Sequence, residues 1–222
     1  MQLPFKQLLV TALLPLSFSA QASSTLLVID AASGQPLENA VVEIQAPGAS
    51  SDMQEGRPEI VQRDAAFVPT VTAIPAGTGV SFPNRDITRH QVYSFSPPKV
   101  FSLDLYLKET PPPVYFEKAG VEVLGCNIHD QMQAFIVISD APFYAVTDAQ
   151  GRIDLSHIPE GRYPMRIWHP RLDDTHQQWW EGDINSAADR QVALTLAAVK
   201  RPTAAPSMLQ QRFQQSLQHQ GH

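Results

Sequence analysis

The sequence predicts an all-β protein with β-sandwich architecture. Short runs rich in Val, Ile, Phe and Tyr, such as TLLVID, HQVYSF and AFIVIS, alternate with clusters of Gly, Pro, Asn and Asp. Such runs form strands, and the clusters between them form turns. The 222 residues include 19 prolines, so few stretches before residue 200 favour a helix of ordinary length. Strands with one apolar face pack as pairs of sheets, which predicts a sandwich.

Residues 1–22 are typical of a secretory signal peptide. Lys6 is followed by an apolar run over residues 8–18 and by Ala-Gln-Ala over residues 20–22, a cleavage site of the small-x-small type. The run is shorter than the roughly 20 apolar residues that span a bilayer. We therefore expect cleavage near Ser23, export to the periplasm and no membrane span.

The composition argues against several classes of function. A formal net charge of −6 disfavours nucleic acid and anionic lipid as partners. A single cysteine excludes a disulfide within the chain. The sequence contains no phosphate-binding glycine loop, no Gly-x-Ser-x-Gly element and no His-x-His pair of the kind that multicopper oxidases need. We therefore do not expect an enzyme.

Three segments with different patterns follow the signal peptide. Residues 26–47 read as two strands around a Gly-Gln-Pro turn. Residues 58–140 carry further strand runs and the cysteine. Residues 143–170 read as strands with alternating apolar and polar positions, separated by Asp-Ala-Gln-Gly and Pro-Glu-Gly turns.

The first and third segments resemble two parts of one carboxypeptidase regulatory-like, prealbumin-like β-sandwich. The matching positions are Val28, Asp30, Gly34, Pro36, Leu37, Ala40 and Val42, then Thr147, Asp148, Gly151, Leu155, Pro159, Gly161 and Tyr163. The resemblance implies that residues 24–48 and 142–198 form one module. Residues 56–141 would then be a second domain, inserted in that module or joined to it. One larger, continuous sandwich with extra hairpins is the alternative.

The cysteine belongs to the stretch GCNIHDQM, residues 125–132, in which Cys126, His129 and Met132 follow a Cys-x-x-His-x-x-Met spacing. One tight loop between adjacent strands can direct these three side chains at one point. His90, at the head of HQVYSF, is the candidate for a second imidazole. Two imidazoles, a thiolate and a weak axial thioether are the donors of a blue-copper site. We therefore expect one type 1 copper ion.

Residues 58–140 resemble the cupredoxins, and most of all the amicyanin and plastocyanin group. The resemblance rests on the Cys-x-x-His-x-x-Met loop and on Asn84, which precedes His90 with the spacing Asn-x5-His. It implies a Greek-key β-sandwich with His90, Cys126 and His129 as equatorial copper ligands, Met132 as axial ligand and Asn84 as the residue that ties the two ligand-bearing loops together. Arg89 stands before His90 in place of the family's proline.

Together, the two modules are similar to exported bacterial proteins labelled methylamine-utilisation proteins. The cupredoxin resemblance implies a periplasmic carrier of single electrons between redox proteins that dock transiently. In that arrangement His129 reaches solvent through an apolar patch, for which Ile128, Pro97 and Pro98 are candidates. Two alternatives remain open: copper storage or delivery without electron transfer, and a metal-free β scaffold.

The remaining histidines and the C-terminal tail are assigned lesser roles. We expect His157, His169 and His176 to make local contacts. Residues 199–222 begin as a Pro/Ala linker and then place Met208, Leu209, Phe213 and Leu217 on one helical stripe. This pattern favours a docking helix or a frayed tail, although Met208, His219 and His222 make a role in copper transfer conceivable.

Overall fold

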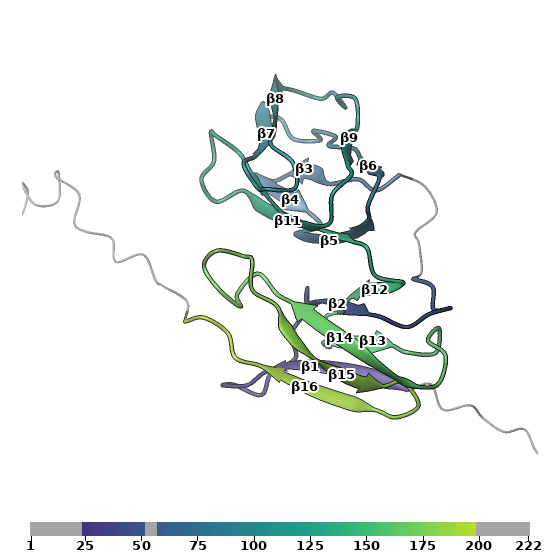
Figure 1. The fold of residues 1–222 in the computed structure, drawn as a ribbon. Coiled ribbons are helices and arrows are strands. Elements are labelled where there is room, and N and C mark those ends of the chain that lie inside the picture. The colour runs from purple at the N-terminus through teal and green to yellow at the C-terminus, as the bar shows by residue number, and fades with distance from the viewer. Residues whose placement is uncertain (1–23, 52–56, 199–222) are drawn as a thin grey trace, which may run out of the picture.

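The computed structural model describes residues 24–51 and 57–198, and within these ranges the chain is all-β, as expected. The described residues form strands β1 to β16 and no helix (Figure 1). No helix in this part of the chain is therefore long and apolar enough to cross a membrane. The predicted signal peptide and the C-terminal stripe lie outside the described residues.

The segments on either side of the middle one, residues 24–51 and 142–198, form two sheets that share one core and are together called the flanking module. A three-stranded sheet has the order β13-β1-β16, and a four-stranded sheet has the order β12-β2-β14-β15. The core between them contains, among others, Leu26, Val42, Met165 and Val192. The strand bounds are β1 Thr25–Asp30, β2 Val41–Ile44, β12 Phe143–Val146, β13 Arg152–Asp154, β14 Arg162–Trp168, β15 Trp180–Asn185 and β16 Arg190–Leu194.

The two halves of the regulatory-like pattern meet in space. The Thr147 hydroxyl accepts a hydrogen bond from the Ala40 amide at 2.9 Å and donates one to the Leu37 carbonyl at 2.6 Å. Gly151 has φ +70°, and a Cβ at this position would lie 2.5 Å from the Val28 carbonyl oxygen. Only glycine fits that approach, because any side chain there would collide with the backbone of β1.

The middle segment forms its own sheets. A five-stranded sheet has the order β5-β11-β10-β7-β8, and two strand pairs, β3-β4 and β6-β9, complete this part of the chain. Apolar residues such as Phe67, Phe82 and Ile136 fill the core. The strand bounds are β3 Val61–Arg63, β4 Ala66–Val68, β5 Val71–Pro75, β6 Thr78–Val80, β7 His90–Ser94, β8 Phe101–Tyr106, β9 Val114–Phe116, β10 Gly120–Gly125 and β11 Gln133–Ser139.

A third apolar cluster joins the two parts. It brings Val41 and Trp168 of the four-stranded sheet together with Val71, Phe135 and Val137 of the five-stranded sheet, and the sheets are stacked one above the other (Figure 1). The Phe135 and Trp168 rings lie 5.3 Å apart between centroids. The strands of the middle segment and those of the flanking segments therefore belong to different sheets with a packed interface between them.

Candidate metal centre

The pairing of β7 with β10 brings His90 close to Cys126. His90 is the first residue of β7, and Cys126 directly follows Gly125, the last residue of β10. The two strands run antiparallel, with Gly125 opposite Tyr93. In an antiparallel pair the start of one strand lies beside the end of the other. Two residues that are distant in sequence therefore meet at one end of the sheet.

The loop that carries the other two predicted ligands is a hairpin connection between β10 and β11. Those strands pair along their full length, from Gly120 opposite Ile138 to Gly125 opposite Gln133. Within the loop, the Met132 amide donates a hydrogen bond to the His129 carbonyl at 2.9 Å. Both ends of the loop are thus fixed by the ladder, and this turn brings His129 back toward Cys126.

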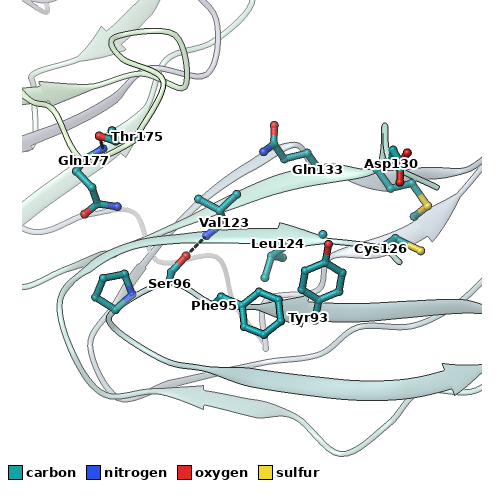
Figure 2. A pocket seen from close by; sticks show the side chains of 13 residues that line it. Tyr93, Phe95, Ser96, Val123, Leu124, Cys126, Asp130, Gln133, Thr175 and Gln177 are labelled. Carbon is teal, nitrogen blue, oxygen red and sulfur yellow. Dashed lines mark hydrogen bonds between the residues drawn. The ribbon is translucent and has the colours of Figure 1, made fainter. Parts of the chain in front are cut away.

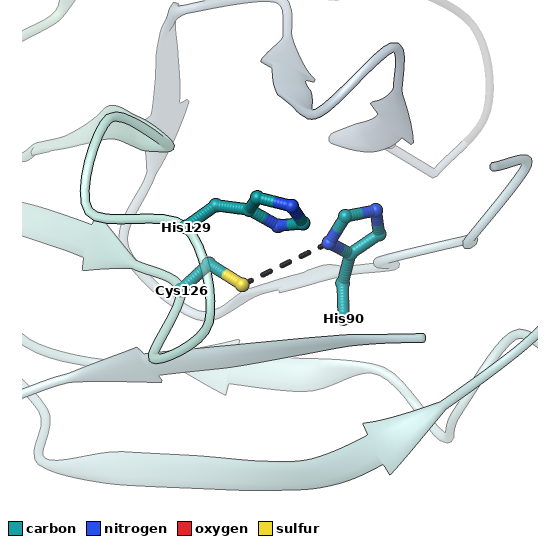
Figure 3. Close-up of side chains that lie close together, drawn as sticks. All are labelled: His90, Cys126 and His129. Carbon is teal, nitrogen blue, oxygen red and sulfur yellow. Dashed lines mark hydrogen bonds between the residues drawn. The ribbon is translucent and has the colours of Figure 1, made fainter. Parts of the chain in front are cut away.

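His90, Cys126 and His129 form one compact cluster (Figure 3). One ligand atom from each residue lies within 4.8 Å of the other two. The Cys126 Sγ and His90 Nδ1 atoms are 3.8 Å apart, and the centroids of the two imidazole rings are 5.0 Å apart. His90 is fully buried and Cys126 is 3% exposed, whereas His129 is partly exposed.

The cluster fits a bound metal ion. His129 Nδ1 is buried without a hydrogen-bond partner among the described residues, and leaving such an atom unpaired costs about 1–3 kcal/mol. Metal–nitrogen and metal–sulfur bonds are about 2.0 Å and 2.3 Å long. If these two bonds meet at the metal at a trigonal angle, the nitrogen and sulfur atoms lie about 3.7 Å apart. The Sγ to Nδ1 separation of 3.8 Å is close to this value. A thiolate and two imidazoles are, in addition, donors that copper accepts.

Met132 lies beside this cluster in the same core. Its side chain is 2% exposed and packs in the apolar cluster that also contains Cys126. Both residues line one open cavity of about 570 Å³ (Figure 2). Met132 is therefore buried next to the three clustered residues, and its role as axial ligand stays a prediction.

Asn84 holds the segment that leads into His90. Its side-chain amide donates to the Thr88 carbonyl at 2.9 Å and to the Tyr106 carbonyl at 2.7 Å, and its oxygen accepts from the Asp86 amide at 2.9 Å. These bonds attach the segment to β8. In the described part of the chain they do not reach residues 126–132, so the tie between the two ligand-bearing loops that we expected from the sequence is not seen.

Sequence patterns did not predict one neighbour of the cluster, Asp86. His90 Nε2 lies 2.9 Å from the Asp86 carboxylate oxygen Oδ2. Hydrogen bonds from the Ala65 amide, the His90 ring and the Ile87 amide lower the pKa of Asp86 to about 2, so the carboxylate is ionised. The only signal in the sequence is the spacing Asp-x3-His, which is too common in loops to indicate a contact.

The cavity beside Cys126 lies on the face of the five-stranded sheet that meets the flanking module. Its lining includes Tyr93 of β7, Phe95 just after β7 and Val123 of β10 (Figure 2). The flanking module contributes Thr175 and Gln177. The sequence did not indicate that this module reaches the cavity. It enters because residues 170–179 pack over β11, where the His176 ring meets Phe135 at 4.8 Å.

The three candidates for the apolar patch around His129 lie in different places, and Pro97 lines the cavity beside Cys126. Ile128 is 45% exposed beside His129, as expected. Pro98 instead contacts Gly120, at the end of β10 that is farthest from Cys126. Ile87, which the sequence did not single out, is 86% exposed on the segment before His90. The exposed apolar residues of the two segments that carry the predicted ligands are therefore Ile87 and Ile128.

The other histidines make local contacts, as we expected. His169 Nδ1 accepts a hydrogen bond from the Arg171 amide at 3.1 Å, and burial lowers the pKa of His169 to about 4. His176 Nδ1 lies 2.9 Å from the Pro170 carbonyl oxygen. His157 follows β13 and lines a cavity together with residues of β5 and β12.

Several solved structures resemble part of the chain. A purple cupredoxin from Nitrosopumilus maritimus is 22% identical, with 37% of this chain and 99% of that chain covered and a TM-score of 0.32. Amicyanin from Paracoccus versutus is 14% identical, with 44% and 97% covered and a TM-score of 0.35. A copper-containing nitrite reductase from Thermus scotoductus SA-01 is 25% identical, with 52% of this chain but 28% of the reductase covered and a TM-score of 0.36. No family model and no curated protein matches the chain.

Proposed function

We propose that the protein is an exported carrier of single electrons with one type 1 copper centre, held by His90, Cys126, His129 and Met132. The observation that carries this proposal is the buried His129 Nδ1, which has no hydrogen-bond partner among residues 24–51 and 57–198 and lies in a cluster with the buried Cys126 and His90. The bound copper would supply a centre that alternates between Cu(I) and Cu(II).

The chain's own residues suit this role because they hold the donors rigidly. His90 and Cys126 belong to paired strands, and the hairpin ladder of β10 and β11 fixes both ends of the loop that carries His129. A close-packed interior has few voids and low compressibility. Donors held in this way keep their positions in both oxidation states, which favours fast transfer.

The surface beside His129 supports a transient partner. His129 is the only partly exposed member of the cluster, and the exposed side chains of Ile87 and Ile128 lie on the two segments that carry the ligands. Small interfaces of this kind are typical of redox encounters, which bury less than about 1,200 Å². We therefore propose that redox proteins dock at this end of the sheet.

A second reading of the cluster is a Cys-His-Asp catalytic arrangement. The order Cys126, His90, Asp86 matches such a triad, with separations of 3.8 Å and 2.9 Å. However, Cys126 is 3% exposed, which leaves its sulfur poorly accessible to a substrate carbonyl. The triad also gives no role to His129 Nδ1. The metal centre accounts for all of these groups and is the better proposal.

Visible spectroscopy of the copper-loaded protein tests the proposal. The mature protein should bind one equivalent of Cu(II) and turn intensely blue, because the thiolate of Cys126 donates charge to the metal. Cys126→Ser should lose the blue band and keep its circular dichroism spectrum, since Ser nearly matches Cys in volume.

The other outcomes separate the alternatives. A colourless protein that retains only Cu(I) would support copper storage or delivery, and failure to bind copper would leave the metal-free scaffold. A blue Cys126→Ser variant would exclude Cys126 as a ligand. Mass spectrometry of the exported protein should find an N-terminus near Ser23 if residues 1–22 are removed.

A further inference from the structure

Asp86 contacts a predicted copper ligand from the side away from the metal site. His90 presents Nδ1 to Cys126 Sγ at 3.8 Å and Nε2 to Asp86 Oδ2 at 2.9 Å. The His90 side chain is 0% exposed and that of Asp86 is 13% exposed. The imidazole thus lies between a thiol and a carboxylate, with one ring nitrogen directed at each.

Backbone groups from separate segments hold the Asp86 carboxylate in place. Its Oδ2 accepts a hydrogen bond from the Ala65 amide at 2.9 Å, and its Oδ1 accepts one from the Ile87 amide at 2.9 Å. Ala65 belongs to the turn between β3 and β4, where Asp64 and Ala65 have φ values of 53° and 54°. Non-glycine residues are uncommon in this conformation, and here it directs the Ala65 amide at Asp86.

We propose that Asp86 is a positioning residue that keeps His90 in the tautomer protonated at Nε2 and leaves Nδ1 free to donate to copper. This inference rests on the proposed copper centre. A carboxylate that accepts the second N–H of a ligating imidazole fixes the ring and makes the ligand more basic. A more basic ligand and a nearby negative charge both favour the more highly charged oxidation state, so Asp86 lowers the reduction potential.

Two substitutions separate the charge of Asp86 from its hydrogen bond. Asp86→Asn removes the charge but keeps an oxygen that can accept from Nε2, whereas Asp86→Ala removes both. Loss of such a partner typically costs 10-fold to 100-fold in metal affinity. If the loss falls mainly on Cu(II), a tenfold change raises the one-electron potential by about 59 mV. We expect a rise of about this size in Asp86→Asn and a larger rise in Asp86→Ala, measured by voltammetry.

Asp130→Asn is the matched control. Asp130 is exposed and directly follows the predicted ligand His129, so this variant removes the same charge close to the centre without removing a contact to a ligand's ring. Its potential should change by clearly less than that of Asp86→Asn. Equal shifts in the reduction potentials of the two variants would show that Asp86 acts only through its charge, and would overturn the proposal.

A measurement on the metal-free protein keeps the inference separate from the copper proposal. ¹⁵N NMR of the imidazole groups in alkaline buffer should show His90 protonated at Nε2 in the wild type, and a different or mixed tautomer in Asp86→Ala. The same tautomer in both proteins would overturn the positioning role. A wild type with the expected tautomer but no copper binding would overturn the proposed function and leave the Asp86 contact intact.

Discussion

Met132 differs from the other predicted donors in its surroundings. It is 2% exposed among apolar side chains and directly precedes β11, so it has a place in the core with or without a metal ion. His90, Cys126 and His129 bring polar atoms into the same region, which apolar packing alone does not explain. Of the four predicted ligands, Met132 is therefore the one whose role the structure supports least.

Substitution of Met132 by Gln should lower the reduction potential. An amide oxygen is a harder donor than a thioether and so favours Cu(II), while the two side chains have similar length. A tenfold change in relative affinity corresponds to about 59 mV, and we expect a decrease of at least that size by voltammetry. Met132→Leu, which removes the donor and keeps the apolar volume, should shift the potential upward. Unchanged potentials in both variants would show that Met132 is only a core residue.

Successive side chains of β10 point to opposite faces of the five-stranded sheet. Val121 and Val123 face the interface with the flanking module, whereas Glu122 and Leu124 point to the other side of the sheet. Glu122 is 0% exposed and accepts a hydrogen bond from the Ser94 hydroxyl on β7. Burial raises the pKa of Glu122 to about 7, although Ser94 and Lys99 act in the opposite direction.

The raised pKa makes the stability of the protein depend on pH through Glu122. Between the ordinary pKa of 4.5 and about 7, the folded protein binds a proton that the unfolded chain releases. The contribution of Glu122 to stability is thus complete below pH 4.5 and decreases as the pH rises through about 7. Relative to Glu122→Gln, the wild type should lose roughly 3 kcal/mol of unfolding free energy between acidic and alkaline buffer.

Denaturant unfolding of both proteins over this pH range measures the effect. His169 has a pKa of about 4 in the folded state, so its own contribution makes stability rise with pH as the unfolded histidine loses its proton. This contribution is the same in both proteins and is removed by taking the difference between them. A difference between the two proteins that stays constant with pH would contradict the prediction and would mean that Glu122 remains ionised in the folded state.

At the scale of the whole molecule, the interface between the two cores decides how independent the parts are. Val71, Phe135 and Val137 from the middle segment pack against Val41 and Trp168 of the flanking module. Arg166 lies 4.4 Å above the Trp179 ring and pairs with the buried Glu43 at the edge of this contact. Each apolar side chain buried here contributes roughly 1.5–3 kcal/mol.

We predict that residues 56–141 alone fold and bind one copper ion. All four predicted ligands and the strands β3 to β11 lie within this range. The isolated polypeptide should be less stable than the full chain and should tend to self-associate, because it exposes the interface face of β5, β10 and β11. Circular dichroism, copper titration and light scattering test these three points.

The complementary polypeptide provides the second half of the test. Residues 24–48, joined by a short Gly/Ser linker to residues 142–198, should fold without binding metal, because the residues of its core all come from these two ranges. If residues 56–141 are unfolded while the full mature chain is folded, the insertion hypothesis is wrong and the two parts are one cooperative unit.

The sequence by itself determined the fold class and the identity of the clustered donors. Strand runs such as HQVYSF and AFIVIS became β7 and β11, because period-two patterning and turn residues are local properties. Cys126 and His129 could be grouped because they share one loop. His90 could be added because chemistry required a second imidazole, and the structure places it 3.8 Å from Cys126 Sγ.

Only the tertiary structure decided the contacts between distant strands. Asp86 beside His90, the reach of Asn84 to β8, and Glu122 beside Ser94 all depend on how β7, β8 and β10 pair. The contact of residues 170–179 with β11 depends on how two cores stack. Local patterns carry no information on register or stacking, since both are set by the joint packing of side chains from many segments.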